Sequence, residues 1–187
     1  VNRMMAEKDN PQGDVWYGGG GILTFEANAD KGIIGAYVPE EAKDWEAVED
    51  GIKLKHEDDK YVGVEVFVLG FAYNTELVKK EEAPKTWDDL LDSDFDNEIV
   101  MTNPMASSTA YLFVQNQLQR LSWNQGWNYL ESLSQLVGQF PDSGSAPPKL
   151  IGTGEYSVGV AYLHALAKYK SQGFDIKVIA PPKTVGD

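Results

Sequence analysis

The sequence lacks cysteine and contains only two histidines among its 187 residues. Without cysteine there are no disulfide bonds and no thiolate chemistry, so the cysteine count leaves the redox compartment open. Two histidines leave little room for a metallohydrolase site. His56 stands in the charged segment 55–60, where we expect a surface side chain rather than a metal ligand.

Long apolar runs are also missing, since no stretch approaches the 18 apolar residues that a membrane-spanning helix requires. The chain shows no signal peptide and opens on Val1 rather than on methionine. We therefore expect it to be a piece of a longer protein, cut at both ends.

Basic residues are scarce relative to acidic ones: 16 Lys and Arg stand against 29 Asp and Glu, which gives a formal charge of −13. This charge argues against a nucleic acid or an anionic membrane as partner, because those surfaces require clustered Lys and Arg. It does not exclude a small anionic ligand in a recessed site, because binding there would depend on local N–H groups and not on the net charge of the surface. The 42% hydrophobic content suffices for a real core, in one domain or in two small lobes.

Residues 97–111 contain the most informative pattern. Residues 99–101 form a short apolar run that predicts a buried strand, and Pro104 ends regular structure. Apolar residues at helical spacing follow, so Ser107, Ser108 and Thr109 are expected where that helix begins. One serine could serve as N-cap, but three hydroxyls exceed what capping requires. A helix N-terminus also offers free N–H groups to an anion, which favours a ligand site.

Two further loops repeat this chemistry. Ser143, Gly144 and Ser145 precede prolines 147 and 148, which suit the first turn of a short helix. Four glycines at 18–21 follow a predicted strand at 14–17, so Gly19 and Gly20 are expected either to line a cleft or to form a flexible loop. These glycines do not form a dinucleotide-binding fingerprint.

The order of elements predicts an α/β fold with a largely parallel or mixed sheet. Strands are expected at 14–17, 61–73, 99–101, 156–162 and 176–180, and helices at 1–10, 22–31, 84–91, 111–121, 123–137 and 163–172. The charged segment 40–60 is expected to be a surface excursion anchored by Trp45 and Ile52. Because ligands bind beyond the carboxyl ends of strands in such sheets, we expect a site at the loops that follow Tyr17, Met101, Phe140 and Ala161.

Several short motifs, in this order and spacing, resemble the extracytoplasmic solute-binding proteins of ABC importers, in the branch often called ferric-iron-type. The motifs are Asp-Val-Trp-Tyr-Gly-Gly-Gly at 14–20, Ala-Tyr-Asn-Thr at 72–75, Pro-Lys-Thr-Trp-Asp-Asp-Leu at 84–90, Asn-Pro with Ser-Ser-Thr at 103–109, Ser-Gly-Ser-Ala-Pro at 143–147, Gly-Glu at 154–155 and Ala-Pro at 180–181. The resemblance covers nearly the whole chain.

The resemblance implies a two-lobed, periplasmic-binding-protein-like clamp with mixed sheets, here a fragment that lacks parts of the first lobe. Residues 1–74 would be part of the first lobe with a strand that crosses to the second, 75–172 the second lobe, and 173–187 a return strand. The implied role is capture of a small solute in the cleft, outside the cytoplasm, in the periplasm or on a lipid anchor. The implied partner is the membrane permease of the importer, and the protein is expected to be a monomer.

The identity of the solute depends on where the chain departs from the family pattern. Ferric-binding members carry an adjacent tyrosine pair just after the strand that corresponds to 156–162, and here His164 and Ala165 stand in that place. The resemblance therefore implies a phosphonate, a sugar phosphate or another phosphoryl compound, held by the two hydroxyl-rich loops with Tyr162 and His164. A ferric-iron transport protein is the alternative. No cofactor and no metal ion are expected.

An enzyme is the alternative from another class. Ser107 or Ser143, His164 and an aspartate could in principle form the triad of a serine hydrolase. The sequence has no G-x-S-x-G elbow, and serine and aspartate are abundant enough to supply a fortuitous set. We therefore expect a binding protein without catalytic residues. A ligand-free interaction module is less consistent still, because it would not need the glycine and hydroxyl loops.

Overall fold

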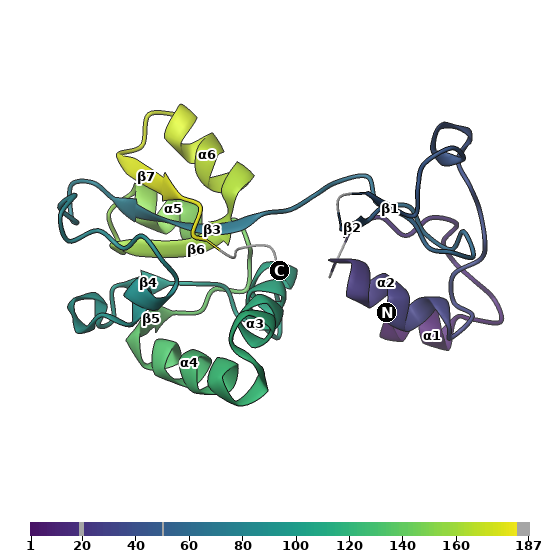
Figure 1. The fold of residues 1–187 in the computed structure, drawn as a ribbon, viewed down its shortest axis with the longest axis horizontal. Helices are drawn as coiled ribbons and strands as arrows, with labels where there is room; N and C mark the ends of the chain where they lie inside the picture. Colours follow the sequence, from purple (N-terminus) through teal and green to yellow (C-terminus); the bar gives the residue numbers. More distant parts are fainter. Residues whose placement is uncertain (19–20, 50, 183–187) are drawn as a thin grey trace. The chain divides into compact units, whose positions relative to one another are not determined.

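The computed structural model describes residues 1–18, 21–49 and 51–182. The chain divides into two compact units, Val1–Val66 and Phe67–Asp187 (Figure 1). Each unit has its own packing and is described by itself.

The first unit is small and is built around aromatic contacts. Its elements are α1 (Asn2–Ala6), α2 (Gly21–Ala29), the 3-10 helix η1 (Glu40–Ala42), and the antiparallel pair β1 (Val48–Glu49) and β2 (Ile52–Lys53). The rings of Trp16 and Phe25 lie 4.4 Å apart, and Phe25 in turn contacts Tyr61 at 5.8 Å. The Glu26 carboxylate accepts hydrogen bonds from the Tyr61 hydroxyl and the Lys53 ammonium group, which ties α2 to β2 and to the segment after it.

Three expectations for the first unit were wrong. Residues 14–17 are not a strand: Val15 and Tyr17 are exposed, and Trp16 packs on α2 instead. Trp45 and Ile52 do not anchor the charged segment, because each remains 40% exposed. His56 is not a surface residue but only 5% exposed, and its Nδ1 accepts the backbone N–H of Asp58 at 3.0 Å.

The second unit contains a five-stranded mixed sheet in the order β5-β4-β6-β3-β7. The strands are β3 (Leu69–Asn74), β4 (Ile99–Val100), β5 (Val137–Gln139), β6 (Val158–Tyr162) and β7 (Ile176–Ile179). Strand β4 runs parallel to both β5 and β6, whereas β3 runs antiparallel to both β6 and β7. The predicted α/β class with a mixed sheet is confirmed.

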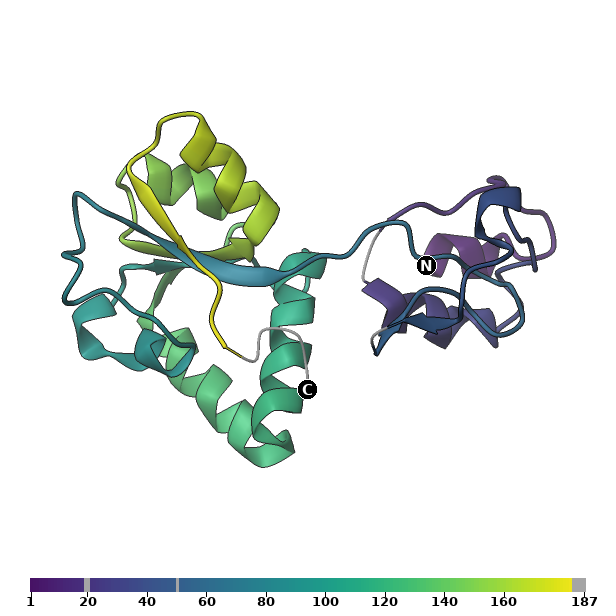
Figure 2. The same ribbon diagram turned by 45° about the horizontal axis from the view of Figure 1, so that its top comes forward.

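Two pairs of helices cover the two faces of this sheet (Figure 2). Helices α3 (Ser108–Leu121) and α4 (Trp123–Leu136) lie on one face, and α5 (Ala146–Gly152) and α6 (Leu163–Ser171) on the other. The alternation along β3 explains this sandwich, since Phe71 packs in the core under α3 and α4 while Ala72 faces α5 and α6. All six residues of β3 are buried, as expected of a central strand.

Short 3-10 helices η2 (Asp88–Leu91) and η3 (Ser93–Phe95) connect β3 to β4. A capping box precedes η2: Thr86 N–H donates to Asp89 Oδ2 at 2.9 Å, and Asp89 N–H donates to Thr86 Oγ1 at 3.3 Å. Arg120 on α3 then holds η2 through two hydrogen bonds to Asp88, at 2.8 and 3.2 Å.

The apolar run 61–73 is a regular strand only in its second half. Val64, Val66 and Phe67 are exposed, and β3 begins at Leu69. The boundary between the units falls after Val66, and both β3 and β7 belong to the sheet of the second unit. The lobe limits 1–74, 75–172 and 173–187 in the whole protein stay a prediction.

Candidate functional site

The candidate site lies at one edge of the sheet of the second unit. Because β4 is parallel to both β5 and β6, the carboxyl ends of these three strands point the same way. The segments that follow them are 101–107, 140–145 and 162–164, which contain most of the predicted ligand-binding residues. The antiparallel strand β3 begins at the same edge, since Leu69 pairs with Tyr162 at the end of β6.

Asn103 fastens the first of these segments to the second. Its backbone N–H donates to the carbonyl of Pro141 at 2.9 Å, and its side-chain amide donates to Asp142 Oδ1 at 3.1 Å. The Asn103 side-chain oxygen also accepts the N–H of Met105 at 2.9 Å, which forms the turn that leads into α3. One asparagine therefore fixes both hydroxyl-bearing loops.

Gly144 permits a close approach of its loop to the start of α3. A Cβ atom at this position would lie 2.8 Å from Thr109 Oγ1 and 3.4 Å from Ser107 Oγ. The hydroxyls of Ser143 and Ser145, which flank the glycine, lie 2.9 Å apart. Hydroxyl groups from two loops thus gather around one glycine backbone.

Tyr162 adds a phenol to this cluster. Burial raises the pKa of Tyr162 above its usual value, and hydrogen bonds with the side chains of Thr109 and Ser108 act in the opposite direction. The phenol is therefore held in its neutral form at physiological pH, in which it can donate and accept hydrogen bonds.

An aromatic group borders the hydroxyls. The rings of Tyr162 and His164 stack with centroids 5.5 Å apart and an interplanar angle of 19°. The ring of Phe67 lies 4.9 Å from Tyr162 and 5.5 Å from His164. The three rings form a triangle whose members come from the segment before β3, the end of β6 and the start of α6.

The start of α3 supplies backbone donors. Ser107 is the N-cap residue, and within the described ranges its side chain makes no capping hydrogen bond. The first N–H groups of a helix have no carbonyl partner inside the helix, so those of Ser108, Thr109 and Ala110 are oriented outward from its end. The second predicted helix start, at α5, precedes a helix of only seven residues. Its loop contributes hydroxyls rather than a substantial dipole.

The predicted site residues separate into two groups. Eight of them lie at or next to the carboxyl ends of β4, β5 and β6: Ser107, Ser143, Gly144 and Ser145 in the loops, Ser108 and Thr109 in the first turn of α3, Tyr162 at the end of β6 and His164 in the first turn of α6. Gly19 and Gly20 lie outside the described residues. Sequence reasoning missed Phe67 and Asn103. An Asn before proline predicts a turn, which was a usable signal for Asn103, but Phe67 is adjacent to the site only because β3 is antiparallel to β6.

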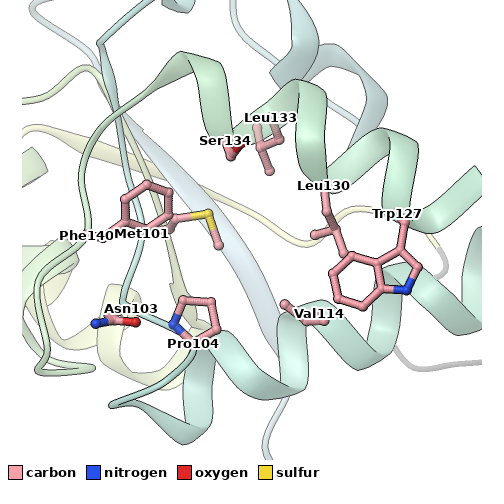
Figure 3. A pocket seen from close by; sticks show the side chains of 9 residues that line it. All are labelled: Met101, Asn103, Pro104, Val114, Trp127, Leu130, Leu133, Ser134 and Phe140. Atoms are coloured by element: carbon pink, nitrogen blue, oxygen red, sulfur yellow. The ribbon is translucent and has the colours of Figure 1, made fainter.

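A pocket of about 460 Å³ opens beside the same Asn103 loop, between α3 and α4 (Figure 3). Its lining is mostly apolar and consists of Met101, Asn103, Pro104, Val114, Trp127, Leu130, Leu133, Ser134 and Phe140. Such a lining suits an apolar group and not a phosphoryl group. The pocket therefore shares a loop with the hydroxyl cluster but not its chemistry.

The described parts of the chain contain no group of three or more His, Asp or Glu side chains placed to hold a metal ion. None of their helices combines the length and the apolar character needed to cross a membrane.

Comparisons with known proteins agree with this architecture. Residues 24–184 match the family of bacterial extracellular solute-binding proteins. An uncharacterised protein of Haemophilus influenzae is 30% identical over 189 residues, which cover 98% of this chain and 54% of that protein. The chain thus spans about half the length of the curated relative that it matches.

Solved structures give the same fold. The periplasmic binding protein AfuA from Actinobacillus pleuropneumoniae, with exogenous fructose 6-phosphate bound, is 30% identical, with a TM-score of 0.84 over 97% of this chain and 57% of its own. Iron-bound HitA from Pseudomonas aeruginosa has a TM-score of 0.77 at 16% identity, over 95% of this chain and 56% of its own. At that identity the likeness to HitA speaks for the fold alone.

The family match covers most of the chain, and the mixed sheet between two pairs of helices agrees with it. The protein belongs to the bacterial extracellular solute-binding protein family.

Proposed function

We propose that the whole protein is the solute-binding component of an ABC importer and that it captures a small phosphoryl-containing anion. The observation that carries the proposal is the meeting of two hydroxyl-bearing loops at Gly144, next to the start of α3. A phosphoryl group has three oxygens that accept hydrogen bonds. Hydroxyls and outward N–H groups are the donors that it requires.

A sugar phosphate fits this arrangement better than inorganic phosphate alone. AfuA, which is 30% identical, has fructose 6-phosphate bound in its solved structure. In this chain the hydroxyl cluster continues into Tyr162 and His164, whose polar atoms provide further hydrogen-bonding positions. We propose Ser107, Ser108, Thr109, Ser143, Gly144 and Ser145 as the phosphoryl grip, with Tyr162 and His164 beside it. Gly19 and Gly20, which lie outside the described residues, stay predicted ligand-binding residues.

Ferric iron is the weaker candidate. Ferric iron prefers anionic oxygen ligands, and the burial that raises the pKa of Tyr162 opposes the phenolate form. The place of a second tyrosine is taken by His164 and Ala165. The serine hydrolase alternative has less support, because Ser143 Oγ is hydrogen-bonded to Ser145 Oγ and the described ring contacts of His164 are with Phe67 and Tyr162.

The remaining parts of the proposal follow from the family. We propose a monomer that works outside the cytoplasm, in the periplasm or on a lipid anchor, delivers its solute to a membrane permease and catalyses no reaction. Residues 1–74 would then belong to the first lobe, 75–172 to the second, and 173–187 would return to the first.

A thermal-unfolding screen of the full-length protein tests the proposal. The compounds are inorganic phosphate, phosphonates, fructose 6-phosphate, ferric ion and polyamines. A true ligand at 100 times its dissociation constant should stabilise the protein by about 2.7 kcal/mol. Stabilisation by a phosphoryl compound is expected. Stabilisation by ferric ion alone, with a stoichiometric phenolate-to-iron absorption band, would contradict the proposal, and so would turnover of an ester substrate.

A further inference from the structure

Phe67 is held at the candidate site by the geometry of the sheet. Leu69 pairs with Tyr162, and the N–H of Leu163 donates to the carbonyl of Val68 at 2.8 Å. Phe67 stands two residues before this pair and His164 two residues after it, and their ring centroids lie 5.5 Å apart. The position of Phe67 is therefore tied to the end of the β3–β6 pairing and to its ring contacts with Tyr162 and His164.

The ring of Phe67 extends an apolar row beyond the core. Leu69, Phe71 and Tyr73 occupy alternate positions of β3 and pack in the core under α3 and α4. Phe67 stands two residues before Leu69. Because side chains alternate between the two faces of extended chain, its ring points to the same side of the sheet as the start of α3. Unlike the other three side chains it is 43% exposed, although two other rings contact it.

The exposed ring of Phe67 offers an apolar surface beside the hydroxyl cluster. The Tyr162 side chain interacts with Ser108 and Thr109 on the one hand and stacks on Phe67 on the other. A ligand held at the hydroxyls therefore has an apolar surface within the reach of its organic part. Covering that surface removes apolar area from water, a gain that inorganic phosphate cannot obtain.

We propose that Phe67 is a specificity-determining residue that packs against the organic part of the bound solute. The solute is accordingly a phosphate ester whose carbon skeleton presents C–H groups, such as a hexose phosphate, and not the free inorganic ion. This inference rests on the proposed function. Tyr162 and His164 support the ring, and the hydroxyl cluster binds the phosphoryl group.

The test compares two probes by isothermal titration calorimetry on the full-length protein: fructose 6-phosphate and inorganic phosphate, the latter also as a competitor. Phe67→Ala should weaken fructose 6-phosphate binding about tenfold, equal to about 1.4 kcal/mol, and leave inorganic phosphate binding unchanged. Phe67→Tyr, which keeps the ring, should retain affinity within about threefold. The matched control is Leu77→Ala, because Leu77 is a similarly exposed apolar residue of the same unit.

Each outcome decides between the alternatives. Equal losses for both probes in Phe67→Ala would overturn the inference, because Phe67 would then act on the phosphoryl grip itself. Unchanged affinity for fructose 6-phosphate in this variant would overturn it as well. If the wild-type protein binds neither probe, the proposed function fails and the inference fails with it. Failure of the proposed function is therefore seen in the titrations of the wild-type protein. Failure of the inference alone is seen only in the titrations of the Phe67→Ala variant.

Discussion

The backbone of Gly144 lies so close to Thr109 that a Cβ atom on residue 144 would stand 2.8 Å from Thr109 Oγ1. This contact joins the loop after β5 to the first turn of α3. It is the point at which two segments that are distant in sequence become one candidate site. Substitutions of residues at this contact should change ligand affinity more than the stability of the fold.

Gly144→Ala should weaken fructose 6-phosphate binding by about tenfold or more. The φ angle of Gly144 is outside the left-handed region, so alanine introduces no backbone strain. The added methyl group must displace Thr109, whose branched side chain has few alternative rotamers. Calorimetric titration measures the effect. Gly35→Ala is the control because a Cβ there meets nothing within 4 Å, and equal affinities for the two variants would contradict the role of Gly144.

Arg120→Met should destabilise the second unit by about 2 kcal/mol without changing affinity. The Arg120 side chain is 10% exposed, and its Nε donates to Gln117 Oε1 at 2.9 Å while its other nitrogens bind Asp88. Because Gln117 is fully buried, its oxygen would lose a hydrogen bond that water cannot replace. Urea unfolding measures the change.

The exposed ion pair between Arg3 and Glu7 provides a matched control for Arg120. Its arginine side chain is 80% exposed, so Arg3→Met should leave the free energy of unfolding unchanged. A similar loss in both variants would show that burial does not determine the effect.

Asp89→Ala should lower stability by about 0.5–1 kcal/mol at neutral pH. Desolvation by neighbouring atoms opposes ionisation of the exposed Asp89 carboxyl, but N–H donors from Lys85 and Thr86 outweigh it and lower its pKa. A lowered folded-state pKa gives stability that is present above the unfolded value, near 4, and is lost as the pH falls through the folded value. Urea unfolding at pH 7 and at pH 2 should therefore show the difference only at pH 7. Glu81→Ala, an exposed acidic residue nearby, is the control.

His164→Gln should weaken fructose 6-phosphate binding by about threefold or more. Glutamine keeps a hydrogen-bond donor but removes the ring that stacks on Tyr162 and lies 5.5 Å from the ring of Phe67. Calorimetric titration of both proteins with fructose 6-phosphate at one pH measures the change. Equal affinities would show that His164 does not contribute to the site.

The sequence predicted most elements of the second unit because their apolar patterns are strong. The strand before Pro104, the helix that begins near Ser108 and the alternation of strand and helix up to Ile179 are confirmed. The expected site at the strand ends stays a prediction, but Ser107, Thr109 and Gly144 do lie close together there. This success has a physical reason, since each of these buried elements carries its own hydrophobic pattern in the sequence.

Features that depend on pairing or on long-range contact were not predictable. Residues 14–17 have the composition of a strand but no paired neighbour in the described part of the first unit. His56 reads as a surface residue from its charged neighbours, yet it is buried against Tyr61, with ring centroids 5.3 Å apart. Phe67 entered the site only through the antiparallel register of β3, which a single sequence does not reveal.

The central claim is that the start of α3 binds the phosphoryl group, and the most direct test is the affinity of Ser108→Leu for fructose 6-phosphate. The leucine would place an apolar side chain among the hydroxyls near Tyr162. Calorimetric titration should give an affinity about a hundredfold or more below wild type, whereas Lys80→Leu, at an exposed position remote in sequence, should bind like wild type. Equal affinities for the Ser108 and Lys80 variants would contradict the claim.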